Sequence, residues 1–245
     1  MFFTVLEALL HFFVLRLRKG RPTLYDRAQW LHETSILVLR RIGITVRSEG
    51  PVPQTGLIVS NHLGYLDIPF HAALGPRIFV SKDDVRSWPV FGLLARLGGT
   101  IFVKRGIRAS ATEAAIEIEF ALRSGVPVML FPEGTSTDGT TLLPFHAFLF
   151  EPAVETASPV SAAAIRYEAP GTDERELCYY ADVRFAPHLL ETLGRKHVSG
   201  RLRFDGKPRI YSHRKRAAND CWERVARLRL RAEYIPHNDM AEQWH

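Results

Sequence analysis

Two short segments of the sequence contain side chains that could move a proton. In residues 61–67 (NHLGYLD), His62 stands five positions before Asp67. Residues 131–139 (FPEGTSTDG) offer Glu133 near their start. An imidazole near neutral pH can take a proton from a hydroxyl and later return it, and a carboxylate at its other ring nitrogen assists. The first segment therefore predicts a pair in which His62 is the base and Asp67 its partner.

Both segments follow apolar runs, residues 57–60 and 126–131, whose pattern predicts buried strands. Gly64 permits a sharp turn after the first run, so that His62 can fold back onto Asp67 at the start of a helix. Ligands of open α/β sheets bind beyond the carboxyl ends of the strands, which is where both segments lie. A His and an Asp at this spacing also arise by chance, as a core or solvent-facing histidine. The strand-end position and the second segment raise the pair above that default.

Four segments in this order resemble the motifs of the glycerolipid acyltransferase family, typified by 1-acyl-glycerol-3-phosphate acyltransferase. They are residues 61–67, 99–105 (GTIFVKR), 131–139 and the proline-containing residues 158–165. Lys82 and residues 88–92 (WPVFG) also match the family pattern, and the resemblance covers roughly residues 30–210. Four ordered segments are far more specific than any one of them.

The resemblance implies a membrane-associated O-acyltransferase that moves a fatty acyl group from acyl-CoA or acyl carrier protein to the hydroxyl of a lysolipid. It implies that His62 is the general base and that Asp67 orients it. It also implies that the acceptor is bound by Lys82, Arg105, Glu133, Gly134 and Thr135. Lys and Arg suit a phosphate-bearing acceptor, although surface cations are ordinarily solvated. A thioester can be attacked without a metal ion, and the sequence predicts neither a metal site nor a cofactor.

Ser136 separates this chain from the phosphatidic-acid-forming branch of the family, which usually has arginine at that position. A cation suited to a bare phosphomonoester is therefore missing there. Residues 131–139, followed by 143–145 (LPF), look more like the bacterial lyso-ornithine-lipid acyltransferases, as do residues 179–182 (YYAD). The resemblance implies activity like that of 1-acyl-sn-glycerol-3-phosphate acyltransferase in phospholipid biosynthesis. Lyso-ornithine lipid or another lysophospholipid is the alternative acceptor.

Two further functions are compatible with the sequence. The net charge of +6 and the pI near 9.5 would suit a non-catalytic basic module that binds membrane or nucleic acid. Such a module gives no role to His62, Asp67 or Glu133, and no nucleic-acid-binding motif is evident, so no nucleic-acid partner is expected. A hydrolase could instead use His62 to activate water on the same thioester. The two cysteines lack a CxxC spacing, which favours a reducing cytosolic setting.

The alternation of strand and helix patterns predicts an α/β fold, a single domain with a largely parallel or mixed sheet flanked by helices. Strands are expected at residues 45–48, 57–60, 78–81, 100–103, 126–131, 160–167, 179–185 and 198–204. Helices are expected at residues 91–97, 110–124 and 146–155, and in the basic stretch 212–234. The expected organisation is a membrane-associated segment at 1–44, the acyltransferase domain at 45–210, and a basic helix and tail at 211–245. The cations of that helix could touch lipid or donor phosphates, but a packed helix with a solvated face is the simpler interpretation.

Residues 1–15 are mostly apolar and are followed by Arg16, Arg18, Lys19 and Arg21. The apolar run is too short to span a bilayer easily, and its charges follow it, unlike those of a secretory signal. With the amphipathic residues 31–44 it predicts two helices, joined near Pro22, that lie in one leaflet with their cations at the head groups. Packing of both helices on the protein's own core is the alternative. The expected location is the cytoplasmic face of the cell inner membrane.

Overall fold

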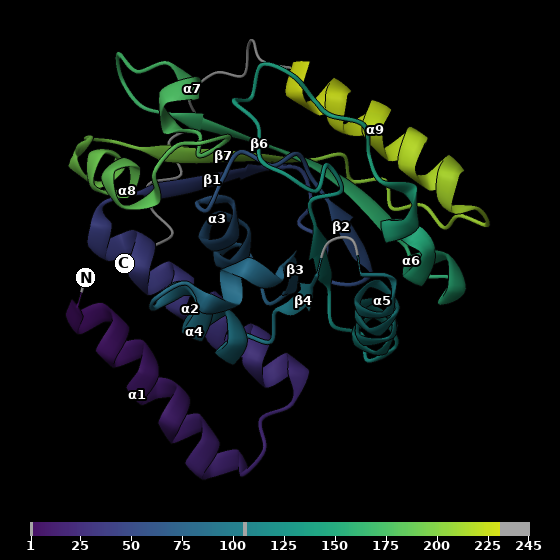
Figure 1. Cartoon of the computed structure of the whole chain (residues 1–245), viewed down its shortest axis with the longest axis horizontal. Coiled ribbons are helices and arrows are strands. Elements are labelled where there is room, and N and C mark those ends of the chain that lie inside the picture. Colours follow the sequence, from purple (N-terminus) through teal and green to yellow (C-terminus); the bar gives the residue numbers. More distant parts are fainter. Residues whose placement is uncertain (1, 105–106, 231–245) are drawn as a thin grey trace.

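A seven-stranded sheet organises the computed structural model, which describes residues 2–104 and 107–230 (Figure 1). The strands are β1 (Thr45–Glu49), β2 (Leu57–Val59), β3 (Ile78–Lys82), β4 (Ile101–Val103), β5 (Val128–Leu130), β6 (Val160–Glu168) and β7 (Ser199–Phe204). Their order is β1-β7-β6-β2-β5-β3-β4. The strands from β6 to β4 run parallel, whereas β7 pairs antiparallel with β6 and parallel with β1. The prediction of an α/β fold with a mixed sheet is confirmed.

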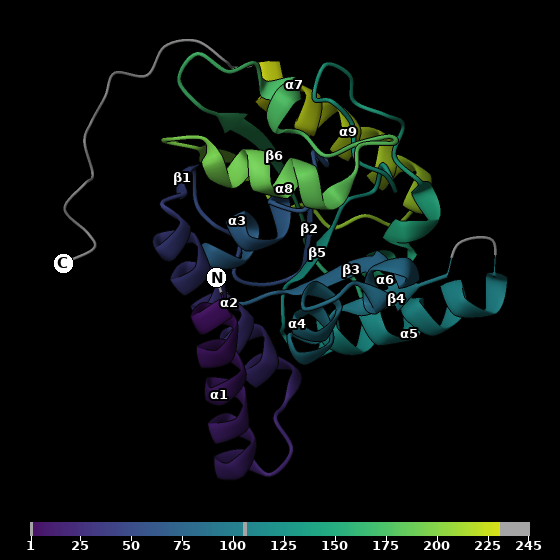
Figure 2. The same cartoon turned by 60° about the vertical axis from the view of Figure 1, so that its left-hand side comes forward.

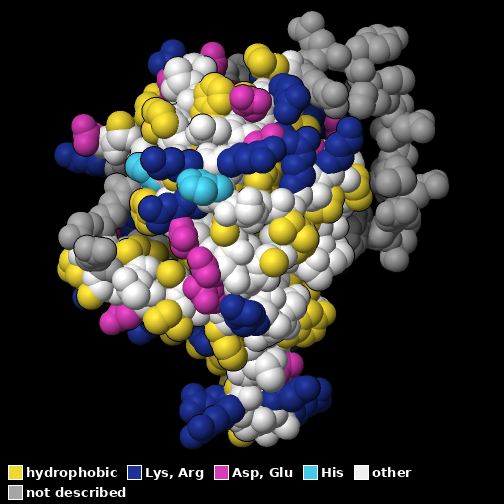
Figure 3. Space-filling view, turned by 90° about the vertical axis from the view of Figure 1, so that its right-hand side faces the viewer, with side chains coloured by type: hydrophobic (Ala, Val, Ile, Leu, Met, Phe, Trp, Pro, Cys, Tyr) yellow, Lys and Arg dark blue, Asp and Glu magenta, His cyan; other side chains and the backbone are white. Residues whose placement is uncertain are grey.

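Two N-terminal helices, α1 (Phe2–Lys19) and α2 (Leu24–Ile42), form a hairpin whose tip projects from the body of the protein (Figure 2). α2 begins before the expected residue 31 because Thr23 and Asp26 cap each other's backbone N–H groups. α1 is fastened to α2 by Trp30, whose Nε1 donates to the carbonyl of Ala8 at 2.9 Å. Lys and Arg side chains gather at the projecting tip (Figure 3). Within the described residues, no helix is both long and apolar enough to cross a membrane.

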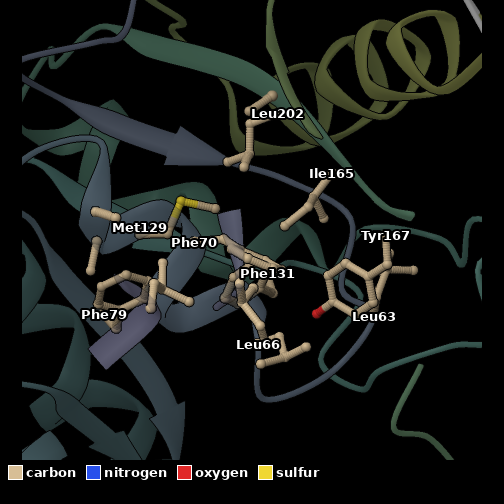
Figure 4. Close-up of a cluster of buried hydrophobic side chains, with 14 of the residues drawn as sticks. Leu63, Leu66, Phe70, Phe79, Met129, Phe131, Ile165, Tyr167 and Leu202 are labelled. Carbon is tan, nitrogen blue, oxygen red and sulfur yellow. The ribbon is translucent and has the colours of Figure 1, made fainter. Parts of the chain in front are cut away.

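The remaining helices cover the two faces of the sheet. They are α3 (Asp67–Ala73), α4 (Phe91–Leu97), α5 (Arg108–Arg123), α6 (Glu151–Glu155), α7 (Glu174–Leu177), α8 (Phe185–Gly194) and α9 (Arg214–Leu230), with short 3₁₀ turns η1 (Asp83–Ser87) and η2 (Ala147–Phe150). Alternate strand residues serve opposite faces. Ile58 and Met129 pack with Phe70 of α3, and Leu57 and Ile118 pack on the α5 side. Figure 4 shows the first cluster, in which Phe70 lies beside Met129.

Two expectations differ from the structure in a way that bears on the site. The expected strand at residues 179–185 is wrong, because these residues form an irregular loop that leads into α8. Ala181 has a φ of 48°, which interrupts an extended backbone. Tyr179 donates its N–H to the carbonyl of Leu63 at 2.8 Å instead of joining the sheet. The basic helix at 212–234 is present as α9, and its expected last residues, 231–234, lie outside the described residues.

Adjacent parallel strands bring the two chemical segments together. β2 pairs with both β5 and β6 in parallel. The residues that follow β2 and β5 therefore leave the sheet side by side at its carboxyl edge. The same edge receives the end of β6 and the end of β3, where Lys82 is the last residue. This topology alone places His62 and Glu133 in one neighbourhood, as the strand-end argument predicts.

Candidate active site

The chain after β2 is fixed before it reaches the histidine. Asn61 is 3% exposed, and its side chain bonds both backbone groups of Ile165 in β6. Its Nδ2 donates to the Ile165 carbonyl at 3.1 Å, and its Oδ1 accepts the Ile165 N–H at 2.9 Å. The side-chain amide of Asn61 makes the two hydrogen bonds that a paired backbone would make with Ile165. The backbone groups of β6 therefore stay bonded beyond the end of β2. The first residue of the NHLGYLD segment is therefore an anchor for the second.

His62 and Asp67 form a direct hydrogen bond. Nδ1 of His62 donates to Oδ2 of Asp67 at 2.6 Å. The Asp67 side chain is fully buried at the first turn of α3, whereas that of His62 is 23% exposed. Since Nδ1 is engaged, Nε2 is the ring nitrogen that can exchange a proton with a ligand. The arrangement is that of a base with an oriented ring and a carboxylate that stabilises its protonated form.

Asp67 is held by four hydrogen bonds. Besides His62, the N–H groups of Leu63 and Gly64 donate to Oδ2 at 2.7 and 3.2 Å. The hydroxyl of Tyr167, at the end of β6, donates to Oδ1. Burial and the neighbouring Asp67 carboxylate raise the pKa of Tyr167 well above its usual value, so the phenol stays protonated and remains a donor. These donors keep the carboxylate in one orientation.

Gly64 makes this loop possible through its lack of a side chain. Its φ is 153°, and a Cβ at this position would lie 2.8 Å from the Cβ of Tyr179. The loop that carries Tyr179 packs directly against the turn between His62 and Asp67, and its N–H bonds the Leu63 carbonyl. Any larger residue would push these two loops apart. The turn at Gly64 is therefore set by close packing as well as by backbone freedom.

Glu133 joins the two chemical segments. Glu133 is 3% exposed. Its carboxylate accepts hydrogen bonds from the backbone N–H groups of His62 and Leu143, each at 2.8 Å. Burial raises the pKa of Glu133, and these two hydrogen bonds act in the opposite direction. The carbonyl of His62 in turn accepts the N–H of Thr137 at 2.9 Å. The backbone of His62 is thus held on both sides by residues 132–146, here called the active-site loop.

The His62 ring also has a fixed stacking partner. It lies on Phe131 with ring centroids 4.4 Å apart and an interplanar angle of 17°. Phe131 is the last residue before the active-site loop and belongs to the buried cluster on the α3 side. The buried His71 also makes an edge contact with Phe131, with ring centroids 5.8 Å apart. The imidazole therefore has a hydrophobic backing that limits its motion.

An aromatic cluster adjoins the His62 loop. Its rings come from the loop itself, from the segment around α4 and from the start of α8, and they belong to Tyr65, Trp88, Phe91, Tyr179, Phe185 and His188. Tyr65 is the link, because its hydroxyl bonds Nδ1 of His188 at 3.0 Å while its ring contacts Tyr179. Burial raises the pKa of Tyr65 to about 12, so it remains neutral. The site is bordered on this side by an apolar surface.

The other expected acceptor residues lie at the same edge of the sheet. Lys82 ends β3, and Gly134, with a φ of 68°, donates its N–H to the Phe131 carbonyl at 3.0 Å. Thr135 follows in the active-site loop and is partly exposed. Arg105 lies outside the described residues. The part of these residues in acceptor binding stays a prediction. Within the described residues, no group of His, Cys, Asp and Glu could hold a metal ion.

Two residues that complete the geometry had no role in the sequence interpretation. Asn61 was visible as part of a motif, but its bond to Ile165 depends on the order of the strands. Tyr167 stood in an expected strand without any motif of its own. Alternate residues of β6 face α3, and Tyr167 is one of them. Because it lies at the end of the strand, its hydroxyl reaches Asp67 in the first turn of that helix. A strand register would have been needed to find it.

Comparisons with known proteins show which family the chain resembles. Residues 43–166 match the family model described as acyltransferase. A lyso-ornithine lipid O-acyltransferase of Rhodobacter capsulatus is 38% identical over 148 residues, which are 58% of this chain and 53% of that protein. A 1-acyl-sn-glycerol-3-phosphate acyltransferase of Neisseria meningitidis serogroup B is 31% identical over 186 residues, which are 76% of this chain and 73% of that protein. The chain matches about half the length of the Rhodobacter relative.

A solved structure shares the fold. The 1-acyl-sn-glycerophosphate (LPA) acyltransferase of Thermotoga maritima superposes with a TM-score of 0.66 at 21% identity, covering 94% of this chain and 89% of that one. The likeness therefore extends beyond the residues that the family model matches. Because residues 43–166 contain both segments that build the His62 site and match the family model over half of the sequence, the chain belongs to the acyltransferase family.

Proposed function

We propose that the protein is a lysolipid O-acyltransferase that uses an acyl-CoA or acyl carrier protein thioester as donor, with no cofactor. The observation that carries this proposal is the His62–Asp67 pair, with Nδ1 bonded at 2.6 Å and the ring partly exposed at the carboxyl edge of the sheet. A base so placed can act on a hydroxyl brought to the site by a ligand. The family membership supplies the chemical class, and the relatives' names supply the acceptor class.

The reaction follows from the geometry of the pair. Nε2 of His62 removes the proton from the acceptor hydroxyl as the oxygen attacks the thioester carbonyl carbon. The new C–O bond forms, the C–S bond breaks, and the proton passes from His62 to the leaving thiolate. Asp67 stabilises the imidazolium that exists between the two proton transfers. The aromatic cluster beside Tyr65 offers an apolar surface for a fatty chain.

Two acceptors are candidates, 1-acyl-sn-glycerol-3-phosphate and lyso-ornithine lipid. Ser136 stands where a phosphate-binding arginine would be expected for the first, and the Rhodobacter relative is more similar than the Neisseria one. Both observations favour lyso-ornithine lipid. Purified protein supplied with acyl-CoA or acyl carrier protein is expected to acylate lyso-ornithine lipid with a higher kcat/KM than 1-acyl-sn-glycerol-3-phosphate. The reverse order would make the phosphate lipid the acceptor, and free fatty acid as the main product would make the protein a hydrolase.

We also propose that α1 binds the membrane surface. One side of this helix packs on α2, where Thr4 and Ala8 are buried and Phe12 contacts Trp30. The opposite side carries an apolar stripe of exposed residues at helical spacing. Its members, with exposed fractions from 54% to 78%, are Phe3, Leu6, Leu10, Phe13 and Leu17. The stripe and the cations at the tip of the hairpin suit a helix that lies along the cytoplasmic face of the inner membrane.

Charges placed on this stripe are expected to release the protein from lipid. Leu6→Glu combined with Leu10→Glu should weaken binding to vesicles of mixed phosphatidylethanolamine and phosphatidylglycerol by about a hundredfold or more, because two leucines leave the apolar phase. Vesicle co-sedimentation measures the effect. His11→Glu adds a charge to an exposed position next to Leu10 but off the stripe, and it should reduce binding much less. Equal losses in the two proteins would indicate simple charge repulsion.

A further inference from the structure

We propose that α9 positions the catalytic histidine by holding the active-site loop, and that Arg229 and Trp222 are the positioning residues. This inference rests on the proposed function. α9 lies outside residues 43–166, which match the family model. It covers the face of β6 opposite to α3, so it does not touch the His62–Asp67 pair itself. In Figure 1 the active-site loop runs beside α9. α9 contacts this loop at two places, Gly139 and Leu143.

The first contact is made by Arg229. The side chain is 12% exposed and forms an ion pair with Glu174 of α7, with Nη2 2.9 Å from Oε2. Nη2 also donates to the carbonyl of Gly139, in the middle of the active-site loop. A guanidinium presents several donors in a fixed plane, so one side chain can bind a carboxylate and a carbonyl at once. Two residues before Gly139, the N–H of Thr137 holds the His62 carbonyl.

The second contact is made by Trp222. Its Nε1 donates to the carbonyl of Leu143 at 3.1 Å. The backbone N–H of Leu143 donates to one carboxylate oxygen of Glu133, and the other oxygen accepts the His62 N–H. The peptide groups on either side of Leu143 therefore connect α9 to the backbone of His62. The loop is held at residues 139 and 143, and His62 is held by the loop on both its N–H and its carbonyl.

The Arg229–Glu174 pair also reaches the partners of the catalytic residues in β6. Nη1 of Arg229 donates to the Ile165 carbonyl at 2.6 Å, the same carbonyl that accepts from Asn61. Glu174 accepts the N–H of Tyr167 at 2.9 Å. One ion pair thus bonds Ile165, to which Asn61 is anchored, and Tyr167, which bonds Asp67. This convergence is why we assign a positioning role to Arg229, on a helix that was expected to pack on the protein with its cations solvated.

The test compares Arg229→Gln with Arg227→Gln in the full-length protein. Arg227 is exposed two positions away on the same helix, and it donates to the Glu223 carbonyl of its own helix. Arg229→Gln is expected to lower kcat by roughly tenfold or more, with the KM of donor and acceptor changed by less than about threefold. Arg227→Gln should behave as wild type. Trp222→Phe keeps an aromatic side chain, although a smaller one, and removes the donor, and it should lower kcat in the same way by a smaller factor.

A second measurement needs no substrate. The proton between His62 Nδ1 and Asp67 is expected to give a low-field NMR signal, which Arg229→Gln should shift or broaden and Arg227→Gln should not. Wild-type kcat in folded Arg229→Gln, with an unchanged signal, overturns the proposal. If Arg229→Gln fails to fold, Trp222→Phe decides, and an unchanged kcat there counts against the role. If the wild type transfers no acyl group, the proposed function fails, while the NMR comparison still decides whether α9 positions the pair.

Discussion

Replacement of His62 by alanine is expected to abolish most acyl transfer, with a fall in kcat of about 10²–10⁴-fold, the usual contribution of a general base. The fold should survive the change. The contacts that hold this residue to Glu133 and Thr137 are made by its backbone, which alanine keeps. Transfer from radiolabelled acyl-CoA to the preferred lysolipid measures the rate, and thermal unfolding verifies the fold.

His213→Ala is the matched control for this substitution. His213 is exposed at the start of α9, where its carbonyl accepts the N–H of Ala217. The substitution removes an imidazole, as His62→Ala does, but from an exposed position outside the site. Turnover should therefore stay within about twofold of wild type, as for most surface substitutions. Unchanged turnover in a folded His62→Ala protein would remove the histidine from the mechanism. The base that activates the acceptor hydroxyl would then lie elsewhere in the chain.

Asp67→Asn is expected to lower kcat by about a hundredfold or more while leaving the loop in place. The amide oxygen can occupy the position of Oδ2 and accept from His62, Leu63 and Gly64. The amide nitrogen then faces the hydroxyl of Tyr167, which can turn from donor to acceptor. The variant keeps the hydrogen-bond geometry around residue 67 but loses the negative charge of the carboxylate. The protonated imidazole of His62 is therefore no longer stabilised.

Tyr167→Phe separates charge from hydrogen bonding at the same carboxylate. This variant keeps the charge of Asp67 and removes one of its four donors, so kcat should fall by roughly tenfold, the size of one charge-assisted bond. Steady-state assays on the two variants and the wild type provide the comparison. A loss in Tyr167→Phe as large as that in Asp67→Asn would mean that orientation, and not charge, is what Asp67 supplies.

The sequence was sufficient to place the chemistry at one edge of a sheet. His62 and Asp67 are close in the chain, and the apolar runs 57–60 and 126–131 predicted buried strands of a largely parallel or mixed sheet. Adjacent parallel strands bring their carboxyl ends together whatever the rest of the fold does. The α/β class and most strand positions followed from the same periodicity, and the short connection 60–67 was tightly constrained by Gly64.

The support of the site could not be predicted in this way. Tyr167 lies 100 positions from Asp67, and Trp222 lies 79 positions from Leu143. Such pairs depend on the strand order and on which residues of β6 face each side. Residues 179–185 show the related failure of local pattern, because their aromatic side chains pack around Tyr65 and not in a strand. A high content of aromatic residues indicates burial, but it does not distinguish a strand from a packed loop.

The distance along the chain between α9 and the loop that it holds has a consequence for synthesis. Arg229 bonds residues that precede it by 64 and 90 positions. A ribosome releases the chain from its N-terminus, so both catalytic segments leave the ribosome well before α9 exists. The nascent chain would carry His62, Asp67 and Glu133 without the contacts through which α9 holds the active-site loop. If α9 has the proposed positioning role, acyl transfer would reach its full rate only after α9 has been synthesised and has packed on β6.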